Sequence, residues 1–131
     1  MNRRVKMGKT ESEVEAVQRA VQRYIDGSYS GSVDTLRKVF HPKALMAGYL
    51  KGQLVIGTPE PFFADIEKHP SMAESGAPYK AEIKFVDVAG QIATVILVET
   101  GFFGVMSFTD YFQLLKEHGE WKIISKTFNS E

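Results

Sequence analysis

The amino-acid sequence predicts an α+β protein in which N-terminal helices pack on one face of a β-sheet. Two observations support this class. Apolar residues recur at helical spacing near the start of the chain, whereas β-branched and aromatic residues dominate four long segments of the second half. Short turns separate these four segments, so we expect them to pair as antiparallel neighbours.

The first helix is expected at about residues 12–26. Thr10 and Glu13 have the spacing of a capping box, in which two side chains satisfy free amides of the first turn. Gly27 is the expected end, because glycine is unfavourable inside a helix. The apolar residues between these limits recur on one face: Val14, Val17, Val21, Tyr24 and Ile25.

Two shorter helices are expected next. One covers about residues 33–40 and ends at His41-Pro42, since the residue before a proline is pushed out of the helical region. The other begins at Thr58-Pro59, where threonine can cap and proline suits the first turn. The segment 70–78 that follows it is predicted to be a loop.

The strands form a short hairpin and then a longer series. Residues 44–50 and 53–56 flank the turn at Lys51-Gly52, and the longer strands are expected near 79–88, 91–100, 105–116 and 121–128. The segment 91–100 is apolar on both sides, which indicates that both faces of the sheet are covered at its centre. Because the helices can cover only one face, a second copy of the protein is expected on the other.

Asp110 interrupts one of these strands between Phe108 and Phe112. Aspartate is disfavoured in strands and is almost never buried without a partner, so this position calls for an explanation. A two-residue hairpin loop at His118-Gly119 places Asp110 opposite Thr127. This register puts Asp110 on the face that carries Phe108, Phe112 and Trp121. The opposite face, with Tyr111, Gln113, Ile124 and Phe128, is the expected dimer interface.

Composition excludes several classes of protein. The chain has 131 residues, of which 44% are hydrophobic, so residues 11–131 are expected to form one domain behind a flexible basic tail at 1–10. Sixteen basic and sixteen acidic residues balance, which argues against a nucleic-acid partner. The first nine residues lack the apolar run of a signal peptide, and no later segment approaches the roughly 20 apolar residues of a membrane span, so a cytoplasmic location is expected.

Several short motifs together resemble one known family. They are YIDG at 24–27, FHPKA at 40–44, the hairpin around Gly52, and FTDYFQLLKEHGEWKIISK at 108–126. In this combination the chain resembles the putative lumazine-binding family of the nuclear transport factor 2-like superfamily over nearly its whole length after Glu11. The resemblance implies a curved antiparallel sheet wrapped around helices as a cone, with a pocket inside and a homodimer formed through the sheet. In some of the wider superfamily, such as ketosteroid isomerases, scytalone dehydratases and polyketide cyclases, an Asp or His inside the cone acts as acid or base.

Asp110 and His41 are the candidate catalytic residues. Among Phe108, Phe112 and Trp121, the Asp110 carboxylate could abstract a proton next to a carbonyl. Alternatively it is a structural acceptor for neighbouring hydrogen-bond donors. His41 exchanges its proton near neutral pH and is expected beside the pocket mouth, although a histidine before a proline also commonly ends a helix and bonds locally.

A hydrophobic or aromatic small molecule is the expected partner. The residues expected to line its pocket, each of which could instead be plain core, are Tyr24, Met46, Tyr49, Phe62, Phe108, Phe112 and Trp121. Neither a metal nor a cofactor is expected: the three histidines lie in separate turns, the chain has no cysteine, and no phosphate-binding loop occurs.

Three functions are compatible with the sequence. The first is a small-molecule-binding protein in which Asp110 orients the ligand. The second is an enzyme of isomerase, dehydratase or cyclase type that uses Asp110 as general base, with His41 or a tyrosine as partner. The third is a dimerising module without catalysis. A closed cone filled with side chains favours the dimerising module, whereas an open cavity in which Asp110 and His41 lie within about one water molecule of each other favours the enzyme.

Overall fold

A computed structural model describes residues 11–131, and the predicted tail at 1–10 lies outside them. Its helices are α1 (Glu13–Ser30), α2 (Val33–Val39), α3 (Glu60–Lys68) and α4 (Met72–Ser75). Its strands are β1 (Phe40–Leu50), β2 (Gln53–Gly57), β3 (Lys80–Ala89), β4 (Ile92–Phe102), β5 (Met106–Glu117) and β6 (Glu120–Ser130). No helix in this part of the chain is long and apolar enough to cross a membrane.

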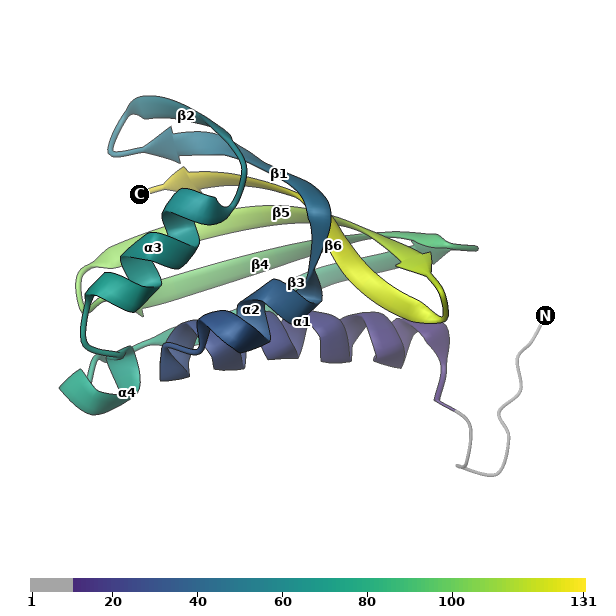
Figure 1. Cartoon of the computed structure of the whole chain (residues 1–131), viewed down its shortest axis with the longest axis horizontal. Helices are drawn as coiled ribbons and strands as arrows, with labels where there is room; N and C mark the ends of the chain where they lie inside the picture. Colours follow the sequence, from purple (N-terminus) through teal and green to yellow (C-terminus); the bar gives the residue numbers. More distant parts are fainter. Residues whose placement is uncertain (1–10) are drawn as a thin grey trace.

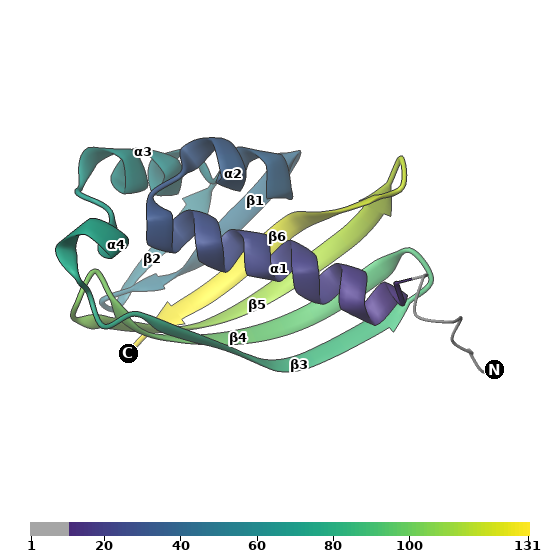
Figure 2. The ribbon, with the colours of Figure 1, turned by 90° about the horizontal axis from the view of Figure 1, so that it is seen from below.

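The strands form one curved sheet in the order β2-β1-β6-β5-β4-β3. The predicted α+β class is confirmed. Helix α1 runs across one face of the sheet, α2 and α3 lie beside α1, and α4 lies near the C-terminal end of α1 (Figures 1 and 2). Neighbouring strands are antiparallel except β1 and β6, which pair in parallel. This parallel pair joins the short N-terminal hairpin to the last strand of the chain.

Helix α1 begins and ends later than predicted. Its capping box is formed by Ser12 and Glu15, and Thr10 lies outside the described residues. Gly27 does not end the helix, which continues to the left-handed Gly31. Gly27 is instead buried against α2, where a Cβ atom would lie 3.1 Å from the Leu36 side chain. The glycine therefore permits close helix packing rather than a turn.

A one-residue bulge in β6 changes the predicted register of the last hairpin. Glu117 faces Glu120 and Leu114 faces Ile123, as predicted. Beyond that point Gln113 faces Ser125, so Ile124 is an extra residue and every later side chain of β6 points to the other face. The predicted partner of Asp110, Thr127, is therefore wrong, and Asp110 faces Phe128.

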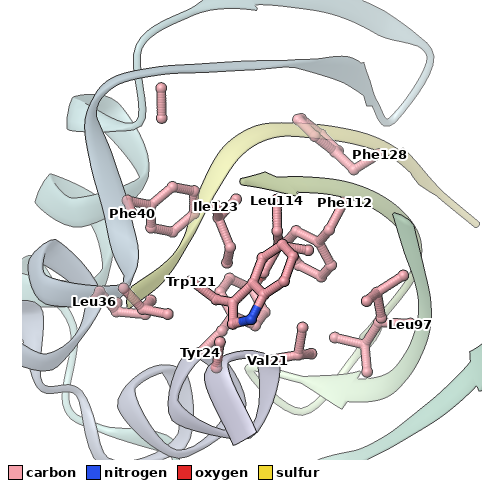
Figure 3. Close-up of a cluster of buried hydrophobic side chains, with 14 of the residues drawn as sticks. Val21, Tyr24, Leu36, Phe40, Leu97, Phe112, Leu114, Trp121, Ile123 and Phe128 are labelled. Atoms are coloured by element: carbon pink, nitrogen blue, oxygen red, sulfur yellow. The ribbon is translucent and has the colours of Figure 1, made fainter. Parts of the chain in front are cut away.

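The interior between α1 and the sheet is filled with apolar and aromatic side chains. Figure 3 shows Val21 and Tyr24 of α1 directed toward Phe112 and Leu114 of β5. The Tyr24 and Phe112 rings meet edge to face with centroids 4.9 Å apart. Each fully buried side chain of this size stabilises the fold by about 1.5–3 kcal/mol through burial alone. The core thus holds the helical layer against the sheet, and it continues up to the buried polar cluster described below.

The outer face of the sheet carries exposed apolar side chains. Leu45, Phe85 and Tyr111 are 61%, 50% and 53% exposed. Strand β4 is the strand that is apolar on both sides, and its Ile96 is half-buried on this outer face, between Phe85 and Tyr111 in the register. Phe128, which we expected here, is only 7% exposed and lies on the inner face because of the β6 bulge.

Candidate functional site

Three ionisable side chains are buried together on the inner face of the sheet. Glu99 of β4, Asp110 of β5 and Lys126 of β6 are 0%, 0% and 4% exposed. In the register Asp110 faces Leu97 on one side and Phe128 on the other, so Glu99 and Lys126 are its diagonal neighbours on adjacent strands. Charged groups are almost never buried this completely unless they are paired or functional. We call these three residues the carboxyl–lysine cluster.

The surroundings of Glu99 favour its protonated form. Burial, and then the adjacent charge of Asp110, raise the pKa of Glu99 well above its usual range. The Tyr79 hydroxyl donates a 2.5 Å hydrogen bond to its Oε2 atom, and burial also raises the pKa of Tyr79 far above its usual value. The neutral form of Glu99 is therefore favoured beside Asp110, and the neutral form of Tyr79 is favoured beside Glu99.

The cluster has more acceptor atoms than donors. With both acids ionised, Glu99 Oε1 and both carboxylate oxygens of Asp110 find no hydrogen-bond partner within residues 11–131, and neither does the Ser28 hydroxyl of α1. The proton on Glu99 can satisfy one pair of these oxygens. An Asp110 oxygen is then still free to accept a hydrogen bond or a proton. Unsatisfied buried acceptors are unfavourable for folding, so their presence indicates a functional role.

Lys126 lies in a box of aromatic rings. Its Nζ atom donates a 2.6 Å hydrogen bond to the Tyr24 hydroxyl oxygen, a neutral partner rather than a carboxylate. The same atom is 4.5 Å from the ring centroid of Phe62, 5.0 Å from that of Tyr24 and 5.4 Å from that of Phe128. Burial raises the pKa of Tyr24 well above its usual range, so the tyrosine keeps its own proton as a donor.

Several residues predicted for the site lie at this cluster. Tyr24 and Phe62 contact Lys126, and Met46 of β1 faces it across the parallel pair. Phe108 and Phe112 flank Asp110 on the inner face and are both buried. The predicted combination of an acid with aromatic walls is therefore present.

Three other predicted residues lie elsewhere. His41 Nε2 is 3.0 Å from Glu117 Oε1, and Glu117 is seven residues from Asp110 along β5, or about 23 Å at the rise of an extended strand. Trp121 lies at the same far end, where its Nε1 donates to Glu13 Oε1 at 2.9 Å. Tyr49 is on the outer face and 49% exposed. The structure therefore does not bring His41 and Asp110 together.

Sequence reasoning missed Glu99, Tyr79 and Lys126. Glu99 ends an apolar strand, and the argument applied to Asp110, that of an acid in an apolar strand, would have singled it out too. Lys126 had no such signal, because strand alternation alone puts it on the outer face with Tyr111. Only the extra residue Ile124 brings it inside.

The carboxyl–lysine cluster is buried by the side chains around it, whereas an open groove lies at the opposite end of the sheet. A groove of about 780 Å³ between α1 and the β5–β6 hairpin is lined by residues that include Arg19, Lys116 and Trp121, and not by Asp110. No trio of His, Cys, Asp or Glu side chains within residues 11–131 is arranged to hold a metal ion. Access to the carboxyl–lysine cluster therefore requires movement of covering side chains, of which Phe62 lies directly over Lys126.

Comparison with known proteins gives the class and then the family. The curved sheet wrapped around helices is the nuclear transport factor 2-like fold: such a protein of unknown function from Methylobacillus flagellatus superposes with a TM-score of 0.81 at 21% identity, over 94% of this chain and 96% of its own. Residues 12–129 match the family described as putative lumazine-binding, and the chain belongs to this family.

Two relatives are similar in sequence over nearly their full length. A nuclear transport factor 2-like protein of unknown function from Shewanella baltica is 26% identical, with a TM-score of 0.79 over 91% of this chain and 94% of its own. A protein named aldolase FrzH from Cladobotryum sp. is 28% identical over 124 residues, which cover 92% of this chain and 94% of that protein.

Proposed function

We propose that this protein is an enzyme that binds a small carbonyl compound at the carboxyl–lysine cluster and transfers protons on it. The observation that carries the proposal is the buried pair Glu99 and Asp110, diagonal neighbours on the inner face whose oxygens include three without a hydrogen-bond partner in the described part of the chain. The surroundings raise the pKa of Glu99, which favours Glu99 as the proton donor of the pair. Two carboxyl groups that differ in protonation can act as acid and base in one reaction.

The chemistry is an enolisation. Asp110 accepts the proton from the carbon next to the carbonyl, and the electrons of that C–H bond form a C=C bond. The carbonyl oxygen becomes a hydroxyl by taking a proton from Glu99, and the pair exchanges its proton to start again. The aromatic walls formed by Phe108 and Phe112 suit an apolar, ring-bearing substrate and exclude water from the acids.

The relative named an aldolase supports this proposal. An aldol reaction proceeds through the same enol or enolate, made by removal of a proton next to a carbonyl. Shared fold alone carries little weight, since related folds host unrelated functions. The sequence similarity spans nearly all of both chains, however, and both candidate acids lie within the matched family region.

Ligand binding without chemistry is the second candidate. It is favoured by the family description, whereas the closed interior by itself is the outcome expected for a dimerising module. A flat heterocycle with N–H groups, such as lumazine, would satisfy the free oxygens of Asp110 and stack on Tyr24 or Phe62. In this case Asp110 orients the ligand and removes no proton.

Exchange of hydrogen for deuterium separates the two candidates. Phenylacetone in D2O is followed by proton NMR, with and without the enzyme. We expect the enzyme to accelerate loss of the signals next to the carbonyl, and Asp110→Asn to reduce this acceleration by about 10²-fold or more. Asp87→Asn, an exposed acid of β3, is the matched control and should exchange like wild type. Line broadening of the probe without any exchange would favour the binding candidate.

A homodimer through the outer face of the sheet is the second part of the proposal. One row of outward residues crosses the sheet in the register from Phe85 through Ile96, Tyr111 and Thr127 to Ala47. The row is mostly apolar, and Phe85 and Tyr111 are half exposed in the single chain. Exposed apolar surface of this kind marks protein contacts. We keep the cytoplasmic location expected from the sequence as part of this proposal.

A further inference from the structure

We propose that Lys126 binds the carbonyl compound covalently, as an iminium formed between its Nζ atom and the carbonyl carbon. The inference rests on the proposed function and specifies how the same site holds its substrate. Amines of buried lysines form such adducts with carbonyl compounds in many enzymes. Here the adduct would place the carbon next to the former carbonyl beside Asp110.

Lys126 is distinguished from the other lysines by its position. Among the nine lysines of residues 11–131 it alone is buried, and the others are exposed or half-buried. Its Nζ atom is held by three aromatic rings and by a hydroxyl oxygen, and no carboxylate oxygen forms a hydrogen bond or an ion pair with it within residues 11–131. A buried lysine that is kept without an ion pair is better explained by a task at the amine.

The surroundings of Nζ suit an aromatic carbonyl compound. The rings of Tyr24, Phe62 and Phe128 surround the amine with flat apolar surface. The Tyr24 hydroxyl can donate a hydrogen bond to the oxygen of the bound carbonyl, because burial keeps this tyrosine protonated. Water, which would hydrolyse the adduct, is excluded from the same space.

The acids supply and remove the protons that the step requires. The Lys126 ammonium passes a proton to Asp110, and the neutral amine then attacks the carbonyl carbon. A C–N bond forms, the π bond of the carbonyl breaks, and the oxygen becomes a hydroxyl by taking one proton from the attacking nitrogen. Asp110 returns the proton to this hydroxyl, which leaves as water while the nitrogen lone pair forms the C=N bond. The balance is one ammonium and one carbonyl giving one iminium and one water. Asp110, again a carboxylate, can then remove the neighbouring C–H proton to give the enamine.

Reductive trapping tests the adduct directly. The intact protein is incubated with phenylacetone and sodium cyanoborohydride, which adds hydride to an iminium and makes the bond permanent. We expect a mass increase equal to one probe molecule less one oxygen atom, and peptide mapping should place it on Lys126. Modification spread over the exposed lysines with none at Lys126 would overturn the inference.

Variants separate this inference from the proposed function. Lys126→Arg keeps a donor for Tyr24 but cannot form the iminium, so it should lose trapping and most of the deuterium exchange. Lys122→Arg, on the same strand and half-buried, is the matched control and should keep both. The covalent step would be refuted if the wild-type protein exchanged deuterium but was never trapped, and if the Lys126→Arg variant exchanged deuterium at the wild-type rate. The acid–base function would be unaffected by this outcome.

A third variant addresses access. The ring centroid of Phe62 is 4.5 Å from Nζ, and Phe62 is not one of the three cluster residues. Phe62→Ala should therefore accelerate trapping at Lys126 several-fold. Circular dichroism and thermal unfolding establish that each variant is folded before it is scored. Slower trapping in a folded Phe62→Ala variant would contradict the proposed position of the adduct.

Discussion

The Nζ atom of Lys126 donates a hydrogen bond of 2.6 Å to the hydroxyl oxygen of Tyr24, which connects strand β6 to helix α1 inside the protein. This contact depends on the bulge at Ile124, which turns Lys126 inward. On the same face Asp110 lies diagonal to Lys126 and Glu99. A donor from the last strand thus completes a site whose acids come from the two strands before it.

Asp110→Asn should leave the stability of the protein unchanged or raise it. The substitution removes a buried charge beside Glu99, and the asparagine amide can donate to an oxygen that now lacks a donor. Thermal unfolding at neutral pH measures the effect, with Asp87→Asn as the exposed control. A markedly lower melting temperature combined with unchanged deuterium exchange would show that Asp110 only holds the strands together.

Glu99→Gln should flatten the dependence of stability on pH. Because the folded state raises the pKa of Glu99 above its unfolded value, the unfolded state loses this proton first as pH rises. The free energy of unfolding of the wild type therefore falls as pH rises above the unfolded pKa near 4.5, by at most about 1.4 kcal/mol per pH unit. The neutral glutamine removes this penalty and can still accept from Tyr79.

Urea unfolding from about pH 5 to about pH 8 measures this difference. The variant should gain stability relative to wild type as pH rises, whereas Glu82→Gln, at an exposed position of β3, should follow the wild-type curve. Parallel curves for wild type and Glu99→Gln over this range would mean that Glu99 is ionised in the folded protein.

Gly48→Ala should destabilise the fold strongly, whereas Gly57→Ala should not. A Cβ atom on Gly48 would lie 2.0 Å from the backbone oxygen of Phe128, so β1 and β6 would have to separate. We expect a loss of about 3 kcal/mol or more for this overpacking. A Cβ atom on Gly57 meets nothing within 4 Å, and its variant should stay within about 0.5 kcal/mol of wild type. Equal urea midpoints for the two variants would contradict the β1–β6 register.

Tyr111→Arg should convert the proposed dimer to a monomer. The side chain is 53% exposed at the middle of the outward apolar row, and an arginine there would face its own copy across a two-fold interface. Light scattering should give about twice the chain mass of 14.7 kDa for wild type and one chain mass for the variant. Val14→Arg, at an exposed apolar position of α1, is the control and should stay dimeric. A wild type that is folded and monomeric would end this part of the proposal.

The sequence alone determined the class of fold and, of the carboxyl–lysine cluster, Asp110 with several of the apolar side chains around it. Periodicity along the chain is a local property, so the long helix, the hairpin from Leu114 to Ile123 and the inward position of Asp110 could all be derived from it. The extent of α1 past Gly27 could not, because the space beside α2 that requires a glycine belongs to tertiary packing.

Only the tertiary structure decided the composition of the site. Side chains of a strand alternate with a period of two, so the single extra residue Ile124 exchanged the inner and outer sets and moved Lys126 and Phe128 inside. The parallel pairing of β1 with β6 joins residues that are about 80 positions apart, as in Leu45 with Ser125, and placed Met46 at the cluster and His41 far from it. No local sequence pattern encodes the bulge at Ile124 or the pairing of β1 with β6. Both depend on which apolar faces can be buried against each other in the folded protein.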